Sequence, residues 1–267
     1  MPACQENALI LWNEKVGPRL YRMGLESPAV AAGAAPGCFV MVRVPGNDGP
    51  LLRRPFSVHR LIEARGSVAG IELLYRVVGP GTSALADCRS DRTLDVLGPL
   101  GRGFRMAAEH DQIAIVGGGI GVAPLVFLAQ SLVSRRSGAR NIYAFLGARC
   151  EAEVLGAEYF QALGIGTVMT TDDGSCGLHC QVTQPLEAHL NRRRPDVVYA
   201  CGPPDMLKCV AQLTARRSIS CQISVETVMA CGMGACLGCV LESLTAKGAY
   251  LHACIDGPVF DATAVRL

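Results

Sequence analysis

The chain has 267 residues, of which 50% are hydrophobic, so it is long enough for about two ordinary domains with real cores. Its formal net charge of +2 gives no reason to expect a nucleic acid or an acidic membrane surface as a partner. The N-terminus has acidic residues and no basic, apolar leader, so we expect the 13 cysteines to lie in a reducing cytoplasm, where thiols bind metal, do redox chemistry or fill core space.

Residues 1–104 are predicted to form an all-β domain. Their apolar runs are short and β-branched, and turn signals separate them; two examples are GCFVMVRVP, which starts at Gly37, and GIELLYRVVG, which starts at Gly70. Many short strands at such spacing are typical of an antiparallel barrel or sandwich. We therefore expect a β-barrel or sandwich as the first domain.

Two blocks in this domain carry side chains suited to a phosphorylated ring cofactor. The run RPFS at 54–57 offers a cation for a phosphate, an aromatic face for a ring and a hydroxyl for a heterocycle nitrogen. The pair YR at 75–76 repeats the aromatic residue and the cation, and a loop with Gly79, Gly81 and Thr82 follows it. The alternative for each block is a strand edge with solvated arginines.

Strands and helices alternate from residue 105 to residue 217. Apolar segments such as IAIVGGG and DVVYACG are separated by helix-like segments such as APLVFLAQSLVSRR, which predicts a parallel sheet built from βαβ units. The uncharged stretch 112–134 is long enough to span a bilayer. Its first half, however, contains a glycine cluster and Pro124, which would break a lipid-exposed helix. We therefore expect a buried strand, a glycine turn and a helix there, and no membrane segment.

The glycine turn lies where the first strand of this sheet should pass into a helix. Backbone N–H groups and the helix N-terminus can bind a pyrophosphate at such a point, and Gly119 and Gly121 would allow the close approach. The turn departs from the G-x-G-x-x-G pattern because Pro124 stands where the third glycine would be. A plain tight turn is the alternative.

Residues 218–267 are predicted to form a small module organised by four cysteines in the spacing C-x4-C-x2-C-x14-C. The first three match the plant-type spacing for an iron–sulfur cluster, and Gly232, Gly234 and Gly238 suit a loop that wraps it. Structural zinc and a disulfide pair are the alternatives. The expected ligands are Cys231, Cys236, Cys239 and Cys254.

Together with GPLG at 98–101 and CGP at 201–203, these blocks resemble, in type and order, the ferredoxin–NADP reductase superfamily. The resemblance implies a flavin-binding antiparallel barrel followed by a nucleotide-binding domain with a parallel sheet. The residues implied for FAD are Arg54, Pro55, Phe56, Ser57, Leu74, Tyr75, Arg76, Gly81 and Thr82. Those implied for the nicotinamide dinucleotide are Gly119, Gly121, Pro124, Gly202 and Pro203.

The compact C-terminal cysteine segment narrows the resemblance. From about Phe39 to Cys254 the chain is similar to electron-transfer subunits of type B dihydroorotate dehydrogenases. That family implies FAD, a 2Fe-2S cluster and NAD as cofactors, in an oxidoreductase subunit of pyrimidine biosynthesis. Electrons would pass between NAD and an FMN-containing subunit that oxidises dihydroorotate, in a heterotetramer with two copies of each chain.

Two other functions remain open. The flavin subunit of a sulfide dehydrogenase or of an NADPH:ferredoxin oxidoreductase shares every block named above. A zinc-stabilised interaction module is the non-enzymatic alternative, and it predicts a colourless protein because zinc does not absorb visible light.

The sequence also leads to expectations about individual catalytic residues and about the choice between NAD and NADP. The resemblance implies that Ser57 hydrogen-bonds the flavin near its reactive nitrogen, and it marks Glu226 as a further catalytic candidate. Cys201 would shape the nicotinamide pocket or fill the core as a small apolar side chain. Arg149 taken alone favours NADP, whereas the resemblance implies NAD. The pair Asp172 and Asp173 would serve a ribose or form a solvated turn.

Overall fold

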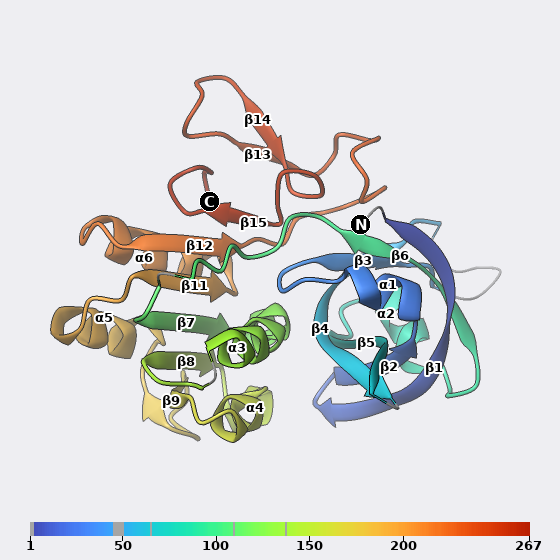
Figure 1. Ribbon diagram of the computed structural model, residues 1–267, viewed down its shortest axis with the longest axis horizontal. Coiled ribbons are helices and arrows are strands. Elements are labelled where there is room, and N and C mark those ends of the chain that lie inside the picture. The colour runs from blue at the N-terminus through green and yellow to red at the C-terminus, as the bar shows by residue number, and fades with distance from the viewer. Residues whose placement is uncertain (1–2, 45–50, 65, 109, 137) are drawn as a thin grey trace.

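The first domain is a closed antiparallel barrel. A computed structural model describes residues 3–44, 51–64, 66–108, 110–136 and 138–267 of the chain. Around the barrel the strands follow the order β1-β2-β5-β4-β3-β6, and every neighbouring pair is antiparallel (Figure 1). The strands are β1 (Cys4–Gly17), β2 (Leu20–Glu26), β3 (Phe39–Val42), β4 (Arg54–Ala64), β5 (Ser67–Arg76) and β6 (Thr93–Leu100). Two short helices accompany them, α1 (Pro28–Gly33) and α2 (Pro80–Ala86).

The second domain is a seven-stranded sheet in the order β10-β9-β8-β7-β11-β12-β15, parallel except for β15. Helices α3 and α4 lie between the sheet and the barrel, and α5 and α6 cover the other face (Figure 1). The strands are β7 (Ile113–Gly118), β8 (Ile142–Ala148), β9 (Gly166–Thr171), β10 (Leu178–His179), β11 (Val197–Cys201), β12 (Ser220–Ser224) and β15 (Val259–Asp261). The helices are α3 (Val122–Arg136), α4 (Ala157–Ala162), α5 (Thr183–Arg192) and α6 (Pro204–Ala215).

The uncharged stretch 112–134 folds as expected. Every residue of β7 is buried, as befits the central strand of a sheet covered on both faces, and the chain passes through a 3-10 turn at 119–121 into α3. In the part of the chain that the structure describes, no helix is long and apolar enough to cross a membrane.

The C-terminal segment shares its core with both domains. Beyond β12 it forms a loop rich in glycine and cysteine and a hairpin of β13 (Val240–Glu242) and β14 (Tyr250–His252). The chain then returns as β15, which pairs antiparallel with β12 at the edge of the sheet. One buried cluster includes Phe39 and Met41 of the barrel, Ile223 of the sheet, and Cys239 and Cys254. The predicted module at 218–267 thus contributes two strands to the sheet of the nucleotide domain.

Candidate functional site

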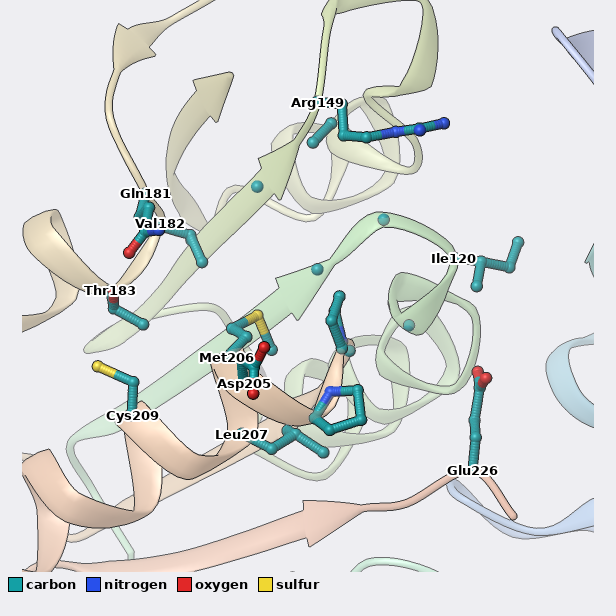
Figure 2. Close-up of a pocket in the computed structure, with 18 of the residues that line it drawn as sticks. Ile120, Arg149, Gln181, Val182, Thr183, Asp205, Met206, Leu207, Cys209 and Glu226 are labelled. Atoms are coloured by element: carbon teal, nitrogen blue, oxygen red, sulfur yellow. The ribbon is translucent and has the colours of Figure 1, made fainter. Parts of the chain in front are cut away.

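A large cavity lies at the carboxyl ends of the parallel strands. It has a volume of about 850 Å³ and opens where the strand order reverses, between β7 and β11, which is the usual ligand site of such sheets. Its wall includes the glycine turn after β7, the end of β8 up to Arg149, and residues 202–207 at the start of α6. In Figure 2, Arg149 stands at the end of β8 and Glu226 on the segment that follows β12.

The glycine turn is built for close approach. A Cβ on Gly121 would collide with the carbonyl group of Cys201, so only glycine lets the turn pack on the end of β11. Gly119 has a φ of 52° and lines the cavity. Pro124 is buried in the first turn of α3, where its missing N–H has no partner to lose. The predicted passage from strand through glycine turn to helix is confirmed.

Two polar atoms at this cavity suit a bound polar ligand. The hydroxyl oxygen of Thr170 and the Nε of Arg76 are buried without a hydrogen-bond partner in the described part of the chain, although both residues line the cavity. Arg76 Nη2 lies 3.3 Å from Glu153 Oε2, and the guanidinium of Arg149 pairs with the same carboxylate. Orphaned donors, arginines and a glycine turn are the chemistry that a dinucleotide needs.

The structure separates the two neighbouring aspartates. Asp172 lines the cavity. The Oδ1 of Asp173 instead accepts hydrogen bonds from the Ser175 hydroxyl at 2.6 Å and the Ser175 amide at 2.9 Å. These bonds hold the pKa of Asp173 below its usual value. Asp173 therefore belongs to a solvated turn, whereas Asp172 faces the cavity.

The two flavin blocks come together on the barrel. The rings of Phe56 and Tyr75 meet edge to face with centroids 5.7 Å apart, which joins the end of β5 to β4. Arg54 and Ser57 are half-buried, whereas Leu74 and Tyr75 are buried in the core. An aromatic pair flanked by half-buried cations and a hydroxyl fits a phosphorylated isoalloxazine cofactor.

The phosphate loop after β5 is held by local hydrogen bonds. Gly81 and Thr82 are buried in the first turn of α2, and the Thr82 hydroxyl accepts hydrogen bonds from the amides of Val78 at 2.8 Å and Gly79 at 3.2 Å. These hydrogen bonds therefore hold the backbone of the loop in place before any phosphate binds.

Asn13 of β1 supports the flavin blocks through hydrogen bonds, and sequence reasoning missed it. Its Oδ1 accepts a hydrogen bond from the Tyr75 hydroxyl at 2.9 Å, and its Nδ2 donates to the carbonyls of Leu85 at 2.8 Å and Cys88 at 2.9 Å. Asn13 thus ties the end of β5 to helix α2. A lone asparagine in an alternating strand carries no sequence signal of such a role.

The three catalytic candidates differ in their surroundings. Ser57 lies on β4 opposite Phe39. Cys201 ends β11 beneath the glycine turn with only 3% of its surface exposed, and burial raises the pKa of its thiol. Glu226 is accessible because it faces the cavity, but protein atoms surround it densely, and this desolvation raises its pKa despite the nearby Arg76.

The four cysteines of the C-terminal segment lie as two adjoining pairs. The hairpin of β13 and β14 brings Cys239 and Cys254 together across the longest spacing, so that the Cys254 amide lies 3.4 Å from Cys239 Sγ. Cys231 Sγ lies 3.4 Å from the amides of both Met233 and Cys236. Burial alone would raise the pKa of Cys231, but these amides lower it to about 7.

The cysteine loop has the backbone that a wrapped cluster needs. Gly232 and Gly234 adopt left-handed φ values of 75° and 86°, which few other residues tolerate, whereas the φ of Gly238 is not in this range. Within the described residues, no group of three or more His, Cys, Asp or Glu side chains is already arranged around one point. Four thiols on adjoining loops, with amides aimed at one sulfur, nevertheless fit an iron–sulfur cluster in their chemistry.

The cysteine loop packs directly on the barrel. A Cβ on Gly232 would lie 2.5 Å from Met41 Cγ, and Met41 pairs with Pro55 of the RPFS block across strands β3 and β4. At the other end of the flavin region, Arg76 Nη2 lies 3.9 Å from the Cβ position of Gly119. The flavin blocks therefore lie between the cysteine loop and the glycine turn.

Comparisons with known proteins agree with this geometry. A family model described as the iron–sulfur cluster binding domain of dihydroorotate dehydrogenase B matches residues 226–266, and an oxidoreductase NAD-binding domain matches residues 115–212. The electron transfer subunit of dihydroorotate dehydrogenase B (NAD(+)) from Geobacillus kaustophilus is 40% identical over 265 residues, covering 98% of this chain and 99% of that protein. The same subunit from Desulforamulus reducens is 36% identical over 97% of each chain.

Solved structures share this architecture. An NADH-dependent reduced ferredoxin-NADP oxidoreductase superposes with a TM-score of 0.81 at 27% identity, over 98% of this chain and 90% of that one. A ferredoxin NADP+ reductase from Neisseria gonorrhoeae shares the fold, with a TM-score of 0.66 at 17% identity over 79% of this chain and 91% of that one.

The chain is an oxidoreductase with the fold of ferredoxin–NADP reductase. Its antiparallel barrel, the cavity between β7 and β11 and the cysteine module together define this class. Similarity to curated relatives over nearly the full chain identifies the family within this class. The chain belongs to the family of electron transfer subunits of dihydroorotate dehydrogenase B. The predicted fold class and the predicted family are thereby confirmed.

Proposed function

We propose that this chain carries electrons from a partner subunit that contains FMN and oxidises dihydroorotate, through a 2Fe-2S cluster and FAD, to NAD in pyrimidine biosynthesis. The observation that carries the proposal is the placement of the flavin blocks between Gly232 of the cysteine loop and Gly119 of the nucleotide turn. When bound, flavin supplies the link between the two-electron chemistry of nicotinamide and the one-electron chemistry of a cluster. The cysteine loop, the flavin blocks and the glycine turn follow one another in the order in which electrons would pass from cluster to flavin to nicotinamide.

The flavin residues would act by binding and orientation. Arg54 and Arg76 would hold the phosphates, Phe56 would lie against the ring and Ser57 would donate to a ring nitrogen, as the family resemblance implies. Leu74 and Tyr75 are buried, so they would support the site from behind, and Gly81 and Thr82 would present backbone amides.

The nucleotide residues would bind NAD in the cavity of about 850 Å³. The turn from Gly119 to Pro124 would hold the pyrophosphate, Gly202 and Pro203 would lie near the nicotinamide, and Asp172 would accept hydrogen bonds from a ribose. Glu226 shares this wall and would exclude water or hold a proton there. Cys201 lies behind the wall, where a buried thiol with a raised pKa would shape the pocket without reacting.

The cluster would be held by Cys231, Cys236, Cys239 and Cys254, and its surroundings suit a partner surface. Cys236 is exposed. Large apolar side chains of the same segment are also exposed, with Val228 at 89%, Met233 at 55% and Leu237 at 57%. Apolar groups gathered on one module mark an interaction site, so the partner subunit would dock there, with two copies of each chain in the complex.

The flavin subunit of an NADPH:ferredoxin oxidoreductase is the second candidate. The full-length superposition on the NADH-dependent reduced ferredoxin-NADP oxidoreductase, with a TM-score of 0.81, favours it over the subunit of a sulfide dehydrogenase. No two of the 13 cysteines, all of which the structure describes, form a disulfide, which suits a reducing compartment, and we propose the cytoplasm.

Native purification of the complex tests the proposal. Mass spectrometry and cofactor analysis should find this chain with an FMN-containing dihydroorotate dehydrogenase subunit, two of each, together with FAD and two irons per copy. An iron–sulfur-rich partner related to glutamate synthase would instead support the second candidate. A colourless chain with one zinc would overturn both, because flavin and 2Fe-2S clusters absorb visible light and zinc does not.

A further inference from the structure

A fully buried histidine links the flavin strand to the nucleotide turn. His59 has 0% of its surface exposed and lies on β4, two residues after Ser57. Its Nδ1 lies 2.8 Å from the carbonyl oxygen of Ala123, which stands in the first turn of α3 between Gly121 and Pro124. A carbonyl oxygen only accepts, so Nδ1 carries the proton and donates. One hydrogen bond therefore joins the two predicted cofactor regions.

The local backbone aims this side chain. The register between β4 and β5 pairs Val58 with Leu73 and Arg60 with Glu72, so His59 is the extra residue of a β-bulge. Bulges redirect a side chain that would otherwise follow the strand alternation, and they are frequent beside functional sites.

The other neighbours of His59 make looser contacts. Its Nε2 lies 3.7 Å from Glu72 Oε1, and Arg22 Nε and Arg60 Nη1 lie 3.8 Å and 4.0 Å from the same carboxylate. Tyr159 of α4 completes the group, because its hydroxyl accepts from Arg22 at 2.6 Å. At neutral pH His59 is uncharged, since burial lowers its pKa to about 4. The bond to Ala123 is thus its one short, directional contact in the described part of the chain.

Apolar packing holds α3 along its length, including Val122, Ala123 and Leu125 of its first turn. Helix α3 lies next to the barrel (Figure 1). Its residue Phe127 belongs to the buried core of the barrel together with Val58 and Leu73. Apolar contacts set how near the helix lies, but they are not directional. A hydrogen bond to the carbonyl at 123 fixes the orientation of the helix start, and with it the adjoining glycine turn.

We propose that His59 is a positioning residue, which holds the glycine turn against the flavin strand and so aligns the nicotinamide nucleotide with the flavin. The inference rests on the proposed function, because it needs both cofactors. His59 itself acts only through the backbone at Ala123.

Three variants of the purified holoprotein test this role. His59→Leu removes the donor, whereas His59→Asn places an amide nitrogen near the former Nδ1 and keeps it. Tyr159→Phe is the matched control, because it removes a hydroxyl from the half-buried side chains around His59 and leaves the bond to Ala123 intact. Amide hydrogen exchange of residues 119–125 reports the turn directly, and NADH oxidation with an artificial dye reports alignment.

In His59→Leu, exchange at 119–125 should rise about tenfold, as expected for the loss of one buried hydrogen bond. The kcat for dye reduction should fall by about tenfold or more, since small misplacements of reacting groups are costly. The KM for NADH should change little, and FAD content should stay at the level of the parent. His59→Asn should restore both exchange and kcat, and Tyr159→Phe should resemble the parent.

Equal exchange and kcat in the parent and His59→Leu would overturn the proposal, as would an Asn variant as impaired as the Leu variant. If His59→Leu does not fold, the Asn variant decides alone: parental exchange and kcat support the role, and raised exchange refutes it. Failure of the proposed function would look different, because the parent itself would then lack flavin or would not oxidise NADH.

Discussion

Arg76 of β5 and Glu153 of the turn after β8 form an ion pair between the barrel and the sheet, with Nη2 3.3 Å from Oε2. Arg149 pairs with the same carboxylate, and this bond, followed by the attraction of Arg76, holds the pKa of Glu153 below its usual value. One carboxylate therefore balances two cations at the wall of the nucleotide cavity. In this arrangement Glu153 offsets part of the positive charge that Arg149 would offer to a 2′-phosphate.

Replacing Glu153 by glutamine should weaken the preference for NAD over NADP. The neutral amide no longer balances the two arginines, which then attract a 2′-phosphate more strongly. The affinity for NADP+ should therefore rise roughly fivefold relative to the affinity for NAD+. Dissociation constants for NAD+ and NADP+, measured by calorimetry on the holoprotein, give the ratio. Glu151→Gln is the control, because this exposed residue lies in the same turn and does not line the cavity. An unchanged ratio in Glu153→Gln would refute the balancing role.

Asp172 should contribute to the same preference from the end of β9, where its amide donates to the carbonyl of Ala148 at 3.0 Å, beside Arg149. Asp172→Asn removes a negative charge that would repel a 2′-phosphate, so the affinity ratio should shift toward NADP+. Asp173→Asn is a close control, since that carboxylate is engaged by Ser175 in the turn. It should lower thermal stability slightly and leave the ratio unchanged. Equal shifts in the two variants would mean that only the general charge of the loop matters.

The barrel, the sheet and the glycine turn could be predicted because local patterns encode them. Short β-branched runs indicated the barrel, and the uncharged run before Gly121 indicated a buried central strand and its turn. The four cysteines were found from spacing alone, since three thiols so close together in a glycine-rich loop are typical of an iron–sulfur cluster.

The contacts that join the parts could not be predicted. His59 is aimed by a β-bulge, and a bulge depends on how two distant strands settle into register. Glu153 meets Arg76 only after the barrel and the sheet have packed. The strand β15 has three residues and no pattern of its own, so its place beside β12 comes from the hairpin that returns the chain. Each depends on tertiary structure rather than on local sequence.

Cys236→Ser should separate the two halves of the electron path. Cys236 is exposed, so the substitution removes a proposed cluster ligand with little cost in packing. NADH oxidation with an artificial dye should remain largely intact, because it would need only the flavin and nucleotide sites. Reduction of NAD+ by dihydroorotate in the complex with the partner should be abolished, together with the cluster absorption and the iron.

The control for Cys236→Ser is Cys180→Ser, which changes a thiol in the loop before α5 and should leave both activities and the iron content unchanged. Loss of both activities in Cys236→Ser would instead mean that the cluster mainly holds the fold.

His59 should also make stability depend on pH in the acid range. Burial lowers its pKa from 6.5 to about 4, so the unfolded chain takes up this proton near pH 6.5 and the folded chain only near pH 4. The contribution of the neutral His59 to the free energy of unfolding is fully present above pH 6.5. It is lost as the pH falls to about 4, and the loss is roughly 3 kcal/mol at most. Glu72, whose pKa burial raises, faces the ring and opposes part of this loss.

Urea unfolding of the parent and of His59→Asn at several pH values between 7 and 4 measures the effect. The free energy of unfolding should fall more steeply in the parent, because asparagine does not titrate and the difference between the two proteins isolates the histidine from Glu72. His179→Asn supplies a matched substitution at an exposed histidine. Parallel curves for the parent and His59→Asn would show that the buried ring is protonated in the native state as readily as in the unfolded chain, and His59 would then not be the neutral donor to Ala123.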